Sequence, residues 1–150
     1  LIGLSDWRKQ TLLMAEHASL LAKKYWQARV SFSFPRLRPA ENVNENIFKH
    51  MISDAQLAQM MIALRLCFPD CEIVLSTREK PAFRDNMAGI CVTRMSAGSK
   101  TNPGGYSEQE QSLEQFQVAD SRTSSQIAEM LSKKNLQPVW KDWDAAFNKI

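Results

Sequence analysis

Short stretches of alternating apolar and polar residues recur along the chain, separated by longer segments with a helical period. Val30, Phe32 and Phe34 alternate with serines, and such alternation is typical of a strand. Residues 72–76 and 90–95 are short apolar runs that predict two more strands. Because helical segments lie between these runs, the order predicts an α/β fold with a parallel sheet.

The segments between the predicted strands carry local signals of helix boundaries. Asp6 is a favourable cap, and Ser53 with Gln56 forms a capping-box pattern. Pro81 suits the first turn of a helix that Gly89 would end in a left-handed conformation. Helices are therefore predicted over residues 7–28, 53–68, 81–88 and 121–135.

The whole pattern is that of a partial barrel. Large apolar residues recur at helical spacing in the first predicted helix, at Leu12, Leu13, Leu20, Leu21 and Tyr25. Residues 1–4 read like the end of a buried strand, so we expect the sequence to be part of a longer protein. Three strands and this opening stub would make about half of an eight-stranded barrel, followed by a helical and aromatic tail.

Polar and cationic residues follow each predicted strand. The first strand ends with Ser33 and Arg36, the second is followed by Arg78, and the third contributes Arg94 and Ser96. Because the carboxyl ends of parallel strands share one edge of a sheet, we expect these groups to converge. Hydroxyl and guanidinium groups together suit a carboxylate held by charge-assisted hydrogen bonds.

An alternative for the arginines is structural, namely ion pairs with Glu79 or Asp85, and the residues alone leave both readings open. The glycine-containing loops at residues 96–99 and 103–106 match no phosphate-binding motif and favour ordinary turns. Neither a nucleophile–base pair nor a catalytic pair of carboxylates is recognisable.

Composition narrows the class of protein. The chain has 150 residues, an apolar fraction of 44% and a net charge of +3, without a basic stripe that would indicate nucleic acid. The sequence lacks both an apolar run long enough for a membrane span and a signal peptide, so we expect a cytoplasmic protein. Cys67, Cys71 and Cys91 lack metal-binding spacing and predict small buried hydrophobes, and His17 and His50 have no partner spacing.

Five segments in this order carry a family resemblance: SFSFPRLRPAE, LSTREKPAFRDN, MSAGSKTNPGGYS, EQFQVADSR and PVWKDWD. Together they resemble the carboxyl-terminal portion of 2-iminoacetate synthase, the radical SAM tyrosine lyase of thiamine biosynthesis. The resemblance implies that residues 1–150 form the carboxyl-terminal half of a (β/α)8 barrel, from about the fifth or sixth strand to the eighth. A carboxyl-terminal extension would follow the last strand within the same residues.

The resemblance also implies the chemistry of the complete protein. Such an enzyme uses a 4Fe-4S cluster and S-adenosylmethionine to break the Cα–Cβ bond of L-tyrosine. The products are 2-iminoacetate and p-cresol, and thiazole synthase consumes the imine. The cofactors would supply the radical, and the protein would position the substrate.

By similarity, Ser33, Arg36, Arg78 and Ser96 would bind the substrate's carboxylate and amine, with Arg94 as a further candidate. Gly3 and Leu4 would lie near the adenine of S-adenosylmethionine.

The cluster motif CxxxCxxC of the family is absent from these residues, so we expect this part alone to bind no cluster and to be inactive. A related tyrosine lyase of hydrogenase maturation is one alternative, but it carries a carboxyl-terminal CxxC where this chain has residues 138–144 without cysteine. A tryptophan lyase and a non-catalytic anion-binding half-barrel remnant are two others.

Overall fold

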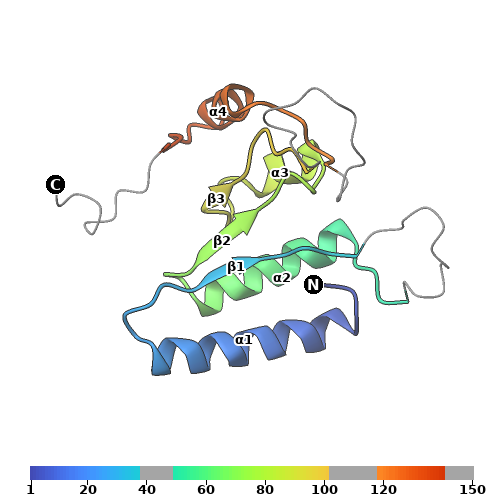
Figure 1. The fold of residues 1–150 in the computed structure, drawn as a ribbon, viewed down its shortest axis with the longest axis vertical. Helices are drawn as coiled ribbons and strands as arrows, with labels where there is room; N and C mark the ends of the chain where they lie inside the picture. Colours follow the sequence, from blue (N-terminus) through green and yellow to red (C-terminus); the bar gives the residue numbers. More distant parts are fainter. Residues whose placement is uncertain (38–48, 102–117, 141–150) are drawn as a thin grey trace.

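The computed structural model describes residues 1–37, 49–101 and 118–140 (Figure 1). The predicted loop at residues 103–106 and most of the predicted aromatic tail lie outside the described residues. The described elements follow one another as α1 (Trp7–Lys24), β1 (Ser31–Ser33), α2 (Asp54–Cys67), β2 (Glu72–Leu75), α3 (Pro81–Met87), β3 (Arg94–Met95) and α4 (Ser124–Lys133).

The sheet is parallel, as the alternation of elements predicts. Its strand order is β1-β2-β3, and an isolated parallel bridge joins Ile2 to Arg36 beyond the end of β1. The apolar opening of the chain therefore lies beside the residues that follow β1, in a parallel orientation, before it bends at Gly3 toward α1. The described residues thus form an α/β fold with a small parallel sheet.

The third strand is shorter than its sequence predicted. A strand was expected over residues 90–95, but β3 contains only Arg94 and Met95. The amide of Ile90 donates to the carbonyl of Met87, so the first residues of the apolar run continue the turn after α3. Val92 makes only an isolated bridge to Ala88.

The core lies between the sheet and the helices that precede β1 and β2. Alternate strand residues Phe32, Ile73 and Leu75 are buried, and α2 buries Leu57 and Leu64 in the same hydrophobic cluster. In Figure 1, α1 and α2 run beside each other near β1, while α4 lies at the other end of the sheet, beyond β3. None of the described helices is long and apolar enough to cross a membrane.

The local signals at the starts of α1, α2 and α3 and at the end of α3 are confirmed, whereas α1 ends at Lys24 instead of residue 28 and α4 begins at Ser124 instead of residue 121. The Asp6 side chain accepts hydrogen bonds from two amides of the first turn of α1. Ser53 and Gln56 form the predicted capping box of α2. Pro81 opens α3, and Gly89 follows it with a φ of 85°, a conformation that glycine adopts without strain.

The apolar stripe on α1 faces away from the rest of the described chain. Leu12, Leu13 and Leu20 are 68%, 54% and 66% exposed. Trp7 and Ala18 are the residues of α1 that enter the core. The stripe has the spacing of a packing face, but no described element covers it.

Candidate functional site

The sheet has one apolar face and one polar face. The residues that alternate with the buried apolar ones include Ser33 and Val74. The strand register places Ser33 opposite Val74 and Val74 opposite Arg94, so these residues form one row on the polar face. Ser33 and Arg94 are both exposed. The structure thus brings two of the predicted site residues together on the face that the helices leave uncovered.

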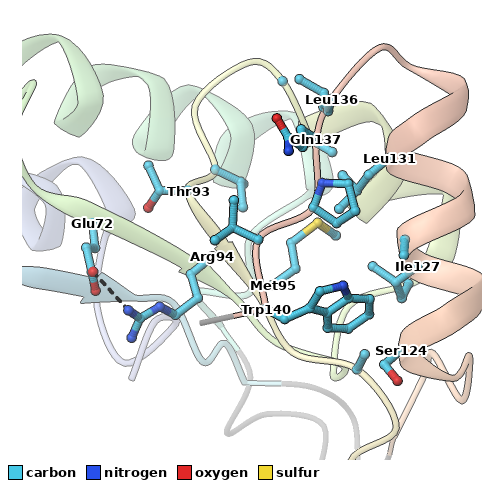
Figure 2. A pocket seen from close by; sticks show the side chains of 17 residues that line it. Glu72, Thr93, Arg94, Met95, Ser124, Ile127, Leu131, Leu136, Gln137 and Trp140 are labelled. Atoms are coloured by element: carbon cyan, nitrogen blue, oxygen red, sulfur yellow. Dashed lines mark hydrogen bonds and ion pairs between the residues drawn. The ribbon is translucent and has the colours of Figure 1, made fainter. Parts of the chain in front are cut away.

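Arg94 is paired on this face. Its guanidinium group donates to the Glu72 carboxylate at 3.1 Å. The pair lies at one side of a cavity of about 640 Å³, which runs along β3 toward α4 and Trp140 (Figure 2). The opposite wall is lined by Ile127, Leu131 and other apolar side chains. The cavity therefore has both charged and apolar walls. Its position is along the edge strand rather than at the carboxyl end of the sheet.

Arg36 lies on the helix-covered side, in phase with Phe32 and Phe34. It is 7% exposed and donates from Nε and Nη2 to the two carboxylate oxygens of Glu79, at 3.1 Å and 2.5 Å. Nη2 also donates to Asp54 at 2.5 Å. Burial acts to lower the pKa of Arg36, but the hydrogen bonds and charges of the two carboxylates outweigh it and raise that pKa. The contact with Glu79 is the ion pair predicted from the sequence as the alternative to substrate binding. A direct role of Arg36 in substrate binding stays a prediction.

Arg78 lies in the turn between β2 and α3. The turn is fixed by main-chain and side-chain hydrogen bonds: the amide of Glu79 donates to the Ser76 carbonyl at 3.3 Å, and the amide of Arg78 donates to Ser76 Oγ at 3.4 Å. The flanking Thr77 and Glu79 are buried, whereas Arg78 is half-buried. Arg78 therefore stands at the carboxyl end of β2, as the sequence predicts.

Ser96 follows β3 directly. Its amide donates to the carbonyl of Leu75 at 3.1 Å, and its carbonyl accepts a hydrogen bond from Arg84. Arg78 and Ser96 thus belong to neighbouring loops at the same end of the sheet. Hydroxyl and guanidinium groups at that edge can hold a carboxylate.

A buried charge network beneath these loops was missed by sequence reasoning. Arg84 and Asp120 are each 0% exposed and form an ion pair. Arg122 bridges Asp120 and Asp85, with its shortest contact to each at 2.7 Å. Asp85 had been considered a partner for a strand-end arginine, but its partner is Arg122, which lies far along the chain. The spacing of these residues in the sequence carries no signal for such a pairing.

Gly3 is placed in the bend that leads from Ile2 into α1. It is buried with a φ of 106°, and a Cβ there would come within 3.2 Å of the Leu37 Cβ. Its amide donates to the Gln10 side chain at 3.1 Å, while Leu4 is exposed. Glycine is therefore required by the backbone at this position, and the predicted contact with adenine stays a prediction.

The described residues do not fit an iron–sulfur cluster. Cys67 is exposed, Cys71 is half-buried and Cys91 is buried. Burial raises the pKa of the Cys71 and Cys91 thiols, which opposes the thiolate form that binds metal. Within the three described ranges, no group of three His, Cys, Asp or Glu side chains could hold a metal ion. A cluster would need ligands from elsewhere.

Comparison with known proteins assigns the chain to a family. Residues 33–137 match the model of the Biotin and Thiamin Synthesis associated domain, which includes both loops described above. The chain belongs to this family. Its resemblance to 2-iminoacetate synthase is confirmed: it is 47% identical over 146 residues to the enzymes of that name from Salmonella typhimurium strain LT2 and Escherichia coli strain K12.

Solved structures agree with the α/β fold of this Biotin and Thiamin Synthesis associated domain. HydG, described as a maturase of the [FeFe]-hydrogenase, superposes with a TM-score of 0.84 at 34% identity over 99% of this chain and 32% of its own. HydG from Carboxydothermus hydrogenoformans superposes with a TM-score of 0.77 at 33% identity, again over 99% of this chain and 33% of its own. The chain also spans only 38% of the length of the two curated enzymes.

Proposed function

We propose that this chain is the carboxyl-terminal portion of a 2-iminoacetate synthase that cleaves L-tyrosine to 2-iminoacetate and p-cresol for thiamine synthesis. The observation that carries the proposal is the 47% identity to two such enzymes, which extends over 97% of the chain. The complete protein would use a 4Fe-4S cluster and S-adenosylmethionine bound mainly by residues outside this chain. The described residues would bind and orient the amino acid.

The proposed architecture is the carboxyl-terminal half of a (β/α)8 barrel. Three features of the described residues support it. The sheet ends at β3 on one side and at the Ile2–Arg36 bridge on the other, so both edges could accept further parallel strands. The polar row containing Ser33 and Arg94 would face the interior of a barrel, because α1 and α2 pack on the opposite face. The uncovered stripe on α1 would then pack against a preceding helix.

In this proposal Arg78, Ser96 and Ser33 hold the carboxylate and amine of tyrosine. Arg78 and Ser96 lie in neighbouring loops at the carboxyl end of the sheet, where barrel enzymes place their active sites. Arg94 would act from within the barrel, in the same row as Ser33. Holding the amino acid at fixed points is the main contribution expected of such groups, because orientation supplies much of the rate in a cofactor-driven reaction.

The role of Arg78 can be tested in the full-length enzyme. Replacing a charge-assisted contact to the substrate with a methylene chain removes about 1.5–3 kcal/mol of binding energy, so Arg78→Met should raise the KM for tyrosine about tenfold to a hundredfold. Arg65→Met is the matched control, since Arg65 caps carbonyls at the other end of β2. An unchanged KM and kcat in Arg78→Met would remove Arg78 from the substrate site.

Complementation tests the biological role. A strain of Escherichia coli lacking its own 2-iminoacetate synthase should grow without thiamine when it carries the full-length gene. Growth would also support thiazole synthase as the partner and the cytoplasm as the site of action, because the imine must reach that enzyme. Failure to grow, with soluble cluster-loaded protein present, would contradict the thiamine role.

Hydrogenase maturation is the second candidate, because the chain superposes closely on HydG. By resemblance, that enzyme binds a second cluster through a carboxyl-terminal CxxC, whereas residues 138–144 of this chain contain no cysteine. Iron and sulfide analysis of the full-length protein separates the two. One 4Fe-4S cluster per chain supports the thiamine enzyme, and two clusters support the maturase.

A further inference from the structure

One short segment joins the two loops of the proposed substrate site. The amides of Ala119 and Asp120 both donate to the carbonyl of Thr77, each at 3.0 Å, and Thr77 precedes Arg78 in the turn after β2. The amide of Gly98, in the loop after β3, donates to the carbonyl of Arg122 at 3.0 Å. Residues 118–123 therefore connect the carboxyl ends of β2 and β3 through main-chain hydrogen bonds.

The side chains of the segment reach the same two loops. Asp120 accepts from Arg84 of α3, and Arg84 in turn donates to the carbonyl of Ser96. Arg122 donates from Nε to Asp120 Oδ1 at 2.9 Å and from Nη2 to Oδ2 at 2.7 Å. It also contacts both carboxylate oxygens of Asp85, at 3.1 Å and 2.7 Å. Apart from the contacts between Arg122 and Asp120, these interactions join the segment to α3, and Arg84 of α3 continues them to the loop after β3.

The network is balanced in charge, and its charged groups are paired with one another. It contains two guanidinium groups and two carboxylates, and Arg84 and Asp120 are completely buried. Burial acts to raise the pKa of Asp120, but its hydrogen bonds from Arg122 and the charge of Arg84 outweigh that effect and lower the pKa, so the carboxylate stays ionised at neutral pH. These four residues are therefore not themselves a site for an anionic substrate.

The network leaves one buried hydrogen-bond donor of Arg84 unsatisfied within the described chain. Its Nε is buried and lacks a hydrogen-bond partner among the described residues. A buried ion pair is often no more stabilising than well-packed apolar side chains, and an unsatisfied donor makes it less so. The network also fixes geometry, because the charged hydrogen bond from Arg84 holds the Ser96 carbonyl while the main-chain amides of Ala119 and Asp120 hold the Thr77 carbonyl.

We propose that Asp120, held by Arg84 and Arg122, is a positioning residue that sets the spacing between the loops of Arg78 and Ser96. The inference rests on the proposed function, in which those two residues hold tyrosine from neighbouring loops. A displacement of about 1 Å between such groups can lower the rate about a hundredfold. Asp120 itself does not touch the substrate.

The test compares Asp120→Asn with the wild type in the full-length, cluster-loaded enzyme. We expect the KM for tyrosine to rise at least about tenfold, as for a lost charged contact. We also expect more 5′-deoxyadenosine formed per p-cresol, because a misplaced substrate leaves the radical uncoupled, with the KM for S-adenosylmethionine unchanged. Glu129→Gln is the control, since Glu129 is exposed on α4 and, among the described residues, pairs with Lys133.

A merely structural role gives a different result. If folded Asp120→Asn protein keeps the wild-type tyrosine KM and the wild-type product ratio, the proposal is wrong. Should that variant not fold, Arg122→Lys replaces it, because Lys keeps the charge and loses the two-point contact to Asp120. The same two readouts then decide.

Hydrogen exchange keeps the inference separate from the proposed function. In the full-length protein, the amides of Ser96 and Gly98 should exchange faster in Asp120→Asn than in the wild type, while the capped start of α2 is unchanged. Equal exchange in the two proteins would overturn the positioning role whatever the substrate. Wild-type protein that forms no p-cresol would defeat the proposed function and leave the exchange comparison intact.

Discussion

At the scale of single residues, the buried arginines Arg36 and Arg84 differ in the groups that they contact. Arg36 is enclosed by Glu79 and Asp54, and its guanidinium carbon also lies 5.7 Å from the centre of the Phe83 ring. Arg84 is enclosed by Asp120 and a main-chain carbonyl. Arg36 and Arg84 are therefore held by ion pairs inside the fold, whereas Arg78 is half-buried in the turn after β2. The residue type and its position after a strand do not distinguish an arginine that forms a buried ion pair from one that binds substrate.

Arg36→Met should destabilise the full-length protein by about 3–5 kcal/mol, because it leaves the buried Glu79 carboxylate without its main partner. The double variant Arg36→Met/Glu79→Gln should recover much of that loss, since it removes the uncompensated charge. Urea unfolding followed by circular dichroism measures both, with exposed Arg8→Met as the control. A loss below about 1 kcal/mol together with a raised tyrosine KM would instead favour Arg36 as a substrate clamp.

Acid should weaken the network through Asp120. Its folded-state pKa is depressed, mainly by hydrogen bonds from Arg122 against the opposing effect of burial. The stabilisation is therefore complete above the unfolded pKa of about 3.9 and is lost as the pH falls through the lower folded value. Asp120→Asn should be less stable near neutrality and should lose less stability than the wild type below about pH 4. Parallel stability curves for the two proteins would contradict this assignment.

At the scale of elements, the sequence specifies three of the four described helix starts; the fourth was predicted at residue 121, but α4 begins at Ser124. Asp6, Ser53 and Pro81 mark the first residues of α1, α2 and α3 correctly because capping depends on neighbours within one turn. The start of β3 was wrong by four residues, since the prediction began at 90 and the strand begins at Arg94. A short apolar run does not reveal where a turn ends and ladder pairing begins.

Ser53→Ala should destabilise the first turn of α2 by about 1 kcal/mol, because it removes the side-chain acceptor for the Gln56 amide. Native-state hydrogen exchange of the full-length protein measures this locally, as faster exchange at Gln56 and Leu57. Gln59→Ala, an exposed change within the same helix, is the control and should leave both amides unaffected. Unchanged protection of Gln56 would show that the capping box does not hold the helix end.

At the scale of the whole molecule, the parallel sheet was predictable and the burial of α1 was not. Alternating strands and helices predict parallel pairing whichever neighbours are present, and the strand register confirms it. No described element covers the leucines of α1, and the sequence of α1 does not reveal which segment would pack on them. The network at Asp120 was likewise beyond prediction, because it joins residues that lie far apart in the sequence.

Leu20→Asp tests whether the stripe on α1 is a packing surface in the full-length protein. Covering a leucine removes apolar area worth about 1.5–3 kcal/mol, and burying a charge there adds further cost. We expect a lower unfolding midpoint for this variant, and little change for Glu16→Gln, a neighbouring exposed position. Equal midpoints for both variants and the wild type would mean that the stripe stays exposed in the complete chain.

The complete protein is proposed to be a tyrosine lyase. The most direct measurement is anaerobic turnover of the full-length, cluster-reconstituted enzyme with dithionite, S-adenosylmethionine and L-tyrosine, followed by chromatography of the products. We expect p-cresol and 5′-deoxyadenosine together, with p-cresol absent when tyrosine is omitted. Formation of 5′-deoxyadenosine without p-cresol, or of neither product by cluster-loaded protein, would contradict tyrosine lyase activity.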